Sequence, residues 1–150
     1  MFLAAQHSDD ALLLGALASS FVFDYVARQA VGGTHLDLFI AKQLPMPAPN
    51  DLDHAVRERL LSLATELVSI GGTVPGLGCS SGIVGWDAER RARRKTELNA
   101  LCFRLFGLSE AESTHVLNSF EVLARRETSD TGRYSTRDAI LTMLEDLERV

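Results

Sequence analysis

Residues 86–107 have the sequence WDAERRARRKTELNALCFRLFG, and this stretch predicts the longest regular helix of the C-terminal half. Its apolar residues recur at helical spacing and fall on one face: Leu98, Leu101, Cys102, Leu105 and Phe106. Gly107 follows the last apolar residue, where glycine commonly ends a helix. A helix with one apolar face must be covered by other elements, so the stretch indicates a packed helical domain.

Two more helices are predicted after Gly107. Ser109 followed by Glu112 is typical of a capping box and predicts a short helix that continues to about Leu117. Residues 120–123 are expected to form a short extended or turn segment. Ser135 or Thr136 is expected to cap the last helix, whose apolar residues are Ile140, Leu141, Met143, Leu144 and Leu147.

The N-terminal half predicts two helices and one β element. The first helix begins near Ser8 and ends at Gly32-Gly33. Polar and apolar residues alternate over 34–40, which predicts a short strand or hairpin, and the prolines at 45, 47 and 49 enforce an extended segment. The second helix runs over 50–70 with Asn50 as its N-cap, and the six glycines of 71–85 predict a loop.

The predicted fold class is therefore mostly α with a minor β part, with about five helices and one short strand or β-hairpin near 34–40. The chain has 150 residues, of which 46% are hydrophobic, and this size suits a single domain with a real core over 1–150. We divide it into a helix-turn-strand and proline-rich part (1–49), a helix (50–70), a glycine-rich loop (71–85) and a C-terminal helical part (86–150).

The composition limits where the protein works and what it binds. No apolar run approaches ~18 residues, so no membrane span is expected. We expect a cytoplasmic location, because no secretory signal is evident and the two cysteines, Cys79 and Cys102, form no disulfide framework.

The charge is −5, whereas proteins that bind nucleic acid on their own are usually basic. The charge is uneven, however, because residues 86–107 carry six basic and three acidic side chains. Any anion-binding face must therefore be local. The strongest candidate is a basic run that is interpreted either as a solvated helix start or as a docking surface for phosphate or for an acidic partner domain. The run consists of Arg90, Arg91, Arg93, Arg94 and Lys95.

Motifs for catalysis and metal binding are absent from the sequence. No histidine lies at metal-ligand spacing from another histidine or a cysteine, and neither a G-x-S-x-G nor a P-loop pattern occurs. We therefore expect no catalytic residue and no metal site. One remote enzymatic alternative is a ribonuclease, because Arg28 and His35, with six residues between them, resemble the paired Arg and His of HEPN-type ribonucleases.

Phrases in the N-terminal half are less generic. Phe23-Asp24-Tyr25-Val26-Ala27-Arg28-Gln29, the Gly32-Gly33 turn and Gln43-Leu44-Pro45 resemble the late target-recognition region of large adenine-specific DNA methyltransferases of type II restriction-modification and DISARM-like phage-defence systems. The later phrases of that family are resembled, in the same order, by Trp86-Asp87 with Arg90-Arg91, by Leu105 to Ser109, and by Phe120 to Val122 with Gly132, Tyr134, Thr136 and Ile140-Leu141.

The resemblance implies a non-catalytic C-terminal part of such an enzyme, present as a fragment or as a truncated relative. The Asn-Pro-Pro-Tyr-type motif that holds a flipped adenine is missing, and so is the glycine-rich loop for S-adenosylmethionine. No cofactor is therefore expected here, since S-adenosylmethionine belongs to the absent catalytic domain.

The resemblance also suggests which residues lie near double-stranded DNA. Glutamine and arginine read base edges, and lysine and arginine hold phosphates. The candidates are Arg28, Gln29, Thr34, His35, Lys42 and Gln43, with Arg90, Arg91, Arg94 and Lys95 as a secondary basic face. Arg28 and Gln29 have a structural alternative, which is to brace the helix end.

The alternative function for the whole chain is that of a helical protein-interaction domain, which forms a homodimer or docks to a methyltransferase domain or subunit.

Overall fold

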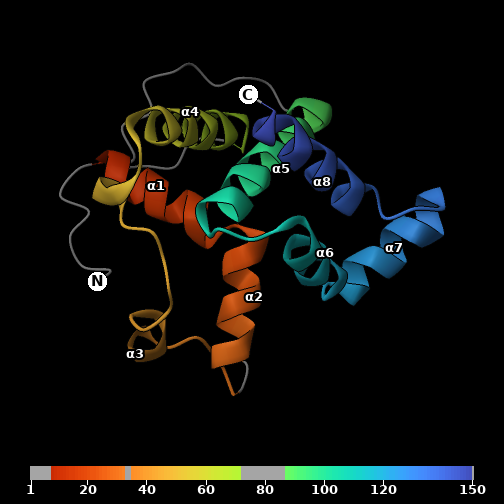
Figure 1. The fold of residues 1–150 in the computed structure, drawn as a ribbon, viewed down its shortest axis with the longest axis horizontal. Helices are drawn as coiled ribbons and strands as arrows, with labels where there is room; N and C mark the ends of the chain where they lie inside the picture. Colours follow the sequence, from red (N-terminus) through yellow and green to blue (C-terminus); the bar gives the residue numbers. More distant parts are fainter. Residues whose placement is uncertain (1–7, 33–34, 72–86, 150) are drawn as a thin grey trace.

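The structure is a computed structural model that describes residues 8–32, 35–71 and 87–149. In these residues the chain forms eight α-helices and one 3₁₀ turn (Figure 1). They are α1 (Ser8–Ala18), α2 (Phe21–Ala30), α3 (Leu38–Ala41), η1 (Pro49–Asp51), α4 (His54–Gly71), α5 (Ala88–Leu105), α6 (Glu110–Asn118), α7 (Glu121–Thr131) and α8 (Ser135–Glu148). The mostly helical fold is confirmed, although the expected number of about five helices was too low.

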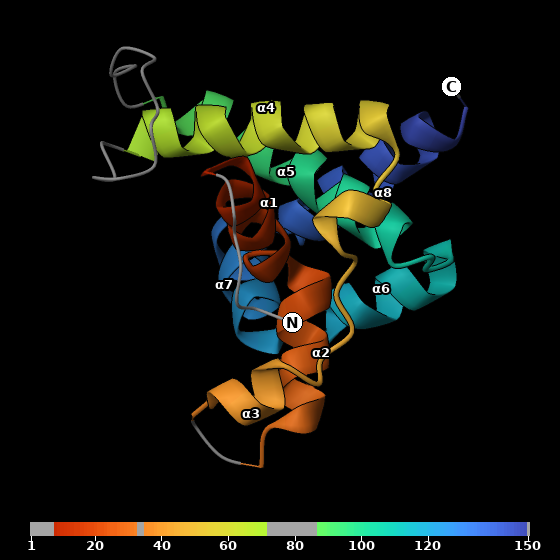
Figure 2. The same ribbon diagram turned by 90° about the vertical axis from the view of Figure 1, so that its left-hand side faces the viewer.

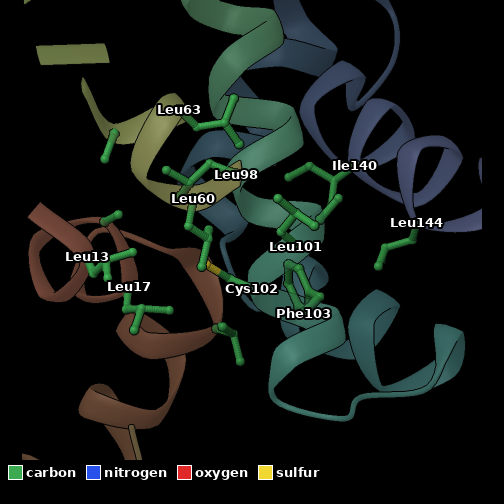
Figure 3. Packing of buried hydrophobic residues seen from close by; sticks show 14 of the residues in the cluster. Leu13, Leu17, Leu60, Leu63, Leu98, Leu101, Cys102, Phe103, Ile140 and Leu144 are labelled. Atoms are coloured by element: carbon green, nitrogen blue, oxygen red, sulfur yellow. The ribbon is translucent and has the colours of Figure 1, made fainter. Parts of the chain in front are cut away.

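The core is built around α5, which packs against α4 on one side and α8 on the other (Figures 1 and 3). Leu98, Leu101 and Cys102 are buried as predicted, whereas Leu105 and Phe106 lie half-buried at its edge. Phe103 is completely buried as well, in the same cluster as Val116 and Leu117 of α6 and Ile140 and Leu144 of α8. Each large side chain buried in this way stabilises the fold by about 1.5–3 kcal/mol.

The ends of α5 and the start of α6 agree with the sequence. The side chain of Asp87 accepts a hydrogen bond from the backbone N–H of Arg90, as an N-cap does. Gly107 has φ +70°, a left-handed conformation that favours glycine over other residues. Ser109 and Glu112 form the predicted capping box.

The first predicted helix is in fact two helices, α1 and α2, whose axes differ by 69°. The break is at Ser20, whose hydroxyl donates to the carbonyl of Leu17 and accepts from the backbone N–H of Phe23. A single straight helix over these residues would carry apolar side chains on all of its faces. Because the chain bends, each of the two shorter helices buries its own apolar side chains: Leu13 and Leu17 on α1, and Val22 and Phe23 on α2.

The predicted strand at 34–40 is wrong. Residues 35–37 have no regular structure, α3 follows them, and no strand occurs in the three described ranges. Asp37 starts the short helix, since its side chain accepts from the backbone N–H of Ile40 at 2.9 Å. The backbone N–H and C=O groups of a strand need hydrogen bonds from a neighbouring strand. The alternation of polar and apolar residues over 34–40 gave no indication of whether such a neighbour exists.

The segment at 120–123 was also mispredicted, because it is the start of α7. This helix has no buried residue, so its sequence carried no apolar periodicity to reveal it. The helix expected to begin at Asn50 begins at His54, where the side chain of Asp53 accepts from the backbone N–H of Ala55. Apart from Gly71, the last residue of α4, the predicted glycine-rich loop lies outside the described residues.

No single helix within the described ranges is long and apolar enough to cross a membrane, although α1 and α2 reach that length together across their bend.

Candidate recognition surfaces

Five of the six primary DNA candidates lie around α3 and the C-terminal end of α2. Arg28 and Gln29 are on the last turn of α2, His35 precedes α3, and Lys42 and Gln43 follow it. All five are exposed, and we call them the α2–α3 surface. In Figures 1 and 2 this part of the chain lies at the end of the molecule away from α4. Thr34, the sixth candidate, lies outside the described residues.

Arg28 is held by neighbouring side chains. Its Nη2 lies 2.7 Å from Oδ2 of Asp24, and its Nε donates to the other carboxylate oxygen at 3.2 Å. The guanidinium also lies 4.7 Å above the ring of Phe120, which itself packs edge-on against Phe21 at 4.8 Å. Arg28 therefore braces α2 against the start of α7, which favours the structural alternative for this residue.

The other members of the α2–α3 surface are less constrained. Gln29, His35 and Lys42 have no hydrogen-bond or ion-pair partner for their side chains in the described part of the chain, whereas Nε2 of Gln43 donates to the carbonyl of Phe39 at 3.3 Å. Residues 21–43 contain two basic and two acidic side chains, so their net charge is zero. Lys42 is thus the single cation of this surface that no carboxylate of the described residues neutralises.

The secondary basic face is mostly part of an ion-pair network between α4 and α5. Arg90 and Arg94 both bind the carboxylate of Glu66, and Nε of Arg94 lies 2.8 Å from Oε2. Arg94 and Arg59 both bind Glu97. Partial burial by itself raises the pKa of Glu66, but the hydrogen bonds and charges of Arg90 and Arg94 outweigh it and leave that pKa below its ordinary value.

The remaining cations of this run differ from one another. Nη1 of Arg91 donates to the carbonyl of Leu67 at 2.8 Å, which ties the first turns of α5 to the end of α4. Arg93 pairs with Glu89 one turn earlier at 3.3 Å, as expected for a solvated helix start. Lys95 is exposed and has no carboxylate partner within the described ranges. The run therefore serves mainly to join two helices, and it leaves one lysine for an external ligand.

A cleft of about 970 Å³ opens beside Lys95. We call it the α2–α5 cleft and define it by residues from five helices: Phe23 and Ala27 of α2, Leu67 of α4, Lys95 of α5, Leu123 of α7 and Ile140 of α8. Its walls are mainly apolar, and Leu36 lies at its edge with 44% of its surface exposed. Sequence reasoning missed this cleft, because its residues come from helices whose packing the apolar pattern does not specify.

The side chains capable of metal binding or nucleophilic chemistry are dispersed or buried in the described residues. No group of three His, Cys, Asp or Glu side chains that could hold a metal is found in them. Burial raises the pKa of the Cys102 thiol to about 12, so this cysteine stays protonated and unreactive. The ribonuclease alternative needs Arg28 and His35 to act together, whereas Arg28 binds Asp24 and Phe120.

Comparisons with known proteins found no match: no family model, no curated protein and no solved structure is similar to this chain. The resemblance to the recognition region of adenine-specific DNA methyltransferases therefore remains a prediction from the residues quoted above.

Proposed function

We propose that this chain is a non-catalytic DNA-recognition and scaffolding module of an adenine-specific DNA methyltransferase, and that it contacts the duplex through the α2–α3 surface. The observation that carries the proposal is that Gln29, His35 and Lys42 share the exposed α2–α3 surface and that their side chains have no partner among the described residues. Glutamine suits the edge of adenine, and lysine suits phosphate.

The charges suggest how strong this contact is. Most of the affinity of proteins for DNA comes from the neutralisation of phosphates. Within the described ranges Lys42 is the single unpaired cation of the α2–α3 surface, and the whole chain carries −5. The proposed contact is accordingly weak for this chain alone. A separate catalytic domain, which would also bind S-adenosylmethionine, would supply most of the phosphate contacts.

The test is the salt dependence of binding to a fluorescently labelled duplex, followed by anisotropy. The affinity of the wild type is expected to fall as salt rises, and Lys42→Ala is expected to reduce the slope of log K against log salt by about one. Gln29→Ala is expected to weaken binding without changing that slope. Arg133→Ala serves as the control, because Arg133 is exposed and lies outside the α2–α3 surface. A duplex affinity that does not depend on salt, or that is equal in wild type and Lys42→Ala, would contradict the proposal.

The protein-interaction alternative is favoured by a different observation, which is the apolar α2–α5 cleft. This alternative function is compatible with the DNA contact, because the scaffolding part of a larger enzyme must also bind that enzyme's other domains or subunits.

A further inference from the structure

We infer that the α2–α5 cleft receives an amphipathic helix of a protein partner, with apolar side chains on the cleft floor and an acidic side chain against Lys95. The inference does not depend on the proposed DNA contact. It follows from the charges around the cleft, from the shape of its apolar surface and from the side chains at its edge.

The cleft has an uncompensated positive charge in a chain that is negative overall. Lys95 lines it without a carboxylate partner among the described residues. Arg126 lies one turn beyond Leu123 on the same side of α7, is exposed, and has no ion-pair partner in the described ranges either. An acidic occupant is therefore favoured by charge complementarity.

The carboxylates around the cleft are already used by the protein itself. Asp24 lines the cleft but is bound to Arg28. Glu66, on α4 next to the lining residue Leu67, is bound to Arg90 and Arg94. Glu127, on α7, accepts hydrogen bonds from Ser135 and Thr136. None of these three carboxylates is left to neutralise Lys95.

Exposed apolar side chains belong to or neighbour, along the chain, two segments that line the cleft, and they suit an occupant with an apolar face. Leu36 lies at the edge of the cleft, and Phe39, which is 76% exposed, follows three residues later. Val122, which is 81% exposed, precedes the lining residue Leu123 on α7. These three are the large hydrophobic side chains that the described residues expose, and each is a lining residue of the cleft or lies within three residues of one along the chain. Exposed apolar surface gathered in this way is typical of a protein-binding groove, in which an amphipathic helix lays its apolar face.

The test uses a designed peptide, because the partner has not been identified. The peptide is fluorescently labelled, helical and about 18 residues long, which is five turns. It carries leucines at positions i, i+3, i+4 and i+7, which form its apolar face, and glutamates along the border of that face. A second peptide is identical except that each glutamate is replaced by lysine. The wild-type protein is expected to bind the glutamate peptide at least about fivefold more tightly than the lysine peptide.

Two variants locate the binding. Lys95→Glu is expected to abolish the preference for the glutamate peptide, and Leu36→Asp is expected to weaken both peptides. Both residues are exposed, so neither substitution is expected to disturb the fold. An unchanged midpoint of thermal unfolding checks that each variant is folded. Arg133→Glu makes the same charge change outside the cleft and is expected to keep the preference. Equal affinities of the wild type for both peptides, or an unchanged preference in Lys95→Glu, would overturn the inference.

Other occupants give different results. A concentration-dependent dimer that Leu36→Asp dissociates would assign the cleft to a second copy of the chain and overturn the inference. Loss of duplex binding in Lys95→Glu, with no peptide binding by the wild type, would assign the cleft to DNA and overturn it as well. Failure of the DNA proposal looks different, because it leaves the peptide preference intact while the duplex affinity is insensitive to salt and to Lys42→Ala.

Discussion

Asn99 is the residue that holds the bend between the first two helices in place. It is buried on α5, and its Oδ1 accepts a hydrogen bond from the backbone N–H of Phe21 at 2.9 Å. That N–H belongs to the first residue of α2 and has no partner within its own helix. The Nδ2 of Asn99 donates to the carbonyl of Lys95 at 2.8 Å, so both ends of the amide are used. One side chain thereby connects α5, the wall of the cleft and the start of α2.

Replacement of Asn99 by alanine is expected to destabilise the protein by about 1–3 kcal/mol, because a backbone N–H at a largely buried site loses its acceptor. The measurement is the free energy of unfolding in urea. Asn50→Ala is the matched control, since Asn50 is exposed, and a change within about 0.5 kcal/mol is expected there. Equal stabilities of Asn99→Ala and the control would show that the bend does not depend on this hydrogen bond.

The start of α8 shows how one helix caps another. The N-cap position is Tyr134, which makes no side-chain cap. Instead the carboxylate of Glu127, on α7, accepts hydrogen bonds from the backbone N–H of Thr136 at 2.8 Å and from the hydroxyl of Ser135 at 3.0 Å. Partial burial by itself raises the pKa of Glu127, but the hydrogen bonds from Thr136 and Ser135 leave it below its ordinary value.

The free energy of unfolding of Glu127→Gln is expected to be about 1 kcal/mol lower than that of the wild type at pH 7. Because the folded-state pKa is lowered, the ionised carboxylate stabilises the protein above its unfolded pKa of about 4.3, and this contribution is lost as the pH falls through the folded pKa. The difference between the two proteins should therefore shrink in urea titrations as the pH is lowered to about 3.

The control for this prediction is Glu121→Gln, on the same helix. Glu121 is exposed and pairs with Arg125 at the surface, so a smaller change, of about 0.3–0.5 kcal/mol, is expected at pH 7. A difference between wild type and Glu127→Gln that stays constant from pH 7 to pH 3 would refute the capping role of the ionised carboxylate.

The elements also show what the sequence could predict. The central helix, α5, and the capping box of α6 were predicted well, because apolar periodicity and capping residues are local signals. The bend at Ser20 was not predictable, since the backbone N–H that follows it, that of Phe21, bonds to Asn99, which is 78 residues further along the chain. The start of α8 likewise takes its cap from another helix. The helix α7 buries no residue, so its sequence lacked the pattern by which helices are recognised.

At the scale of the whole molecule, packing decided which predicted site residues remain available. The α4–α5 network engages Arg90 and Arg94, while Phe120 and Asp24 engage Arg28. A count of basic residues along the chain could not reveal this, because Glu66 and Phe120 lie on elements far along the chain from the arginines that they contact. Of the surfaces considered in the described ranges, the α2–α3 surface and the α2–α5 cleft remain for ligands, and the apolar walls of the cleft come from helices distant in the sequence.

The central claim, that this chain contacts DNA through the α2–α3 surface, is tested most directly by the backbone amide NMR spectrum of the protein titrated with a DNA duplex at low salt. We expect the amide signals of residues 28–43 to shift progressively with duplex concentration, while those of residues 88–95 in α5 stay in place. A spectrum that does not change, or shifts confined to the first turns of α5, would contradict the claim.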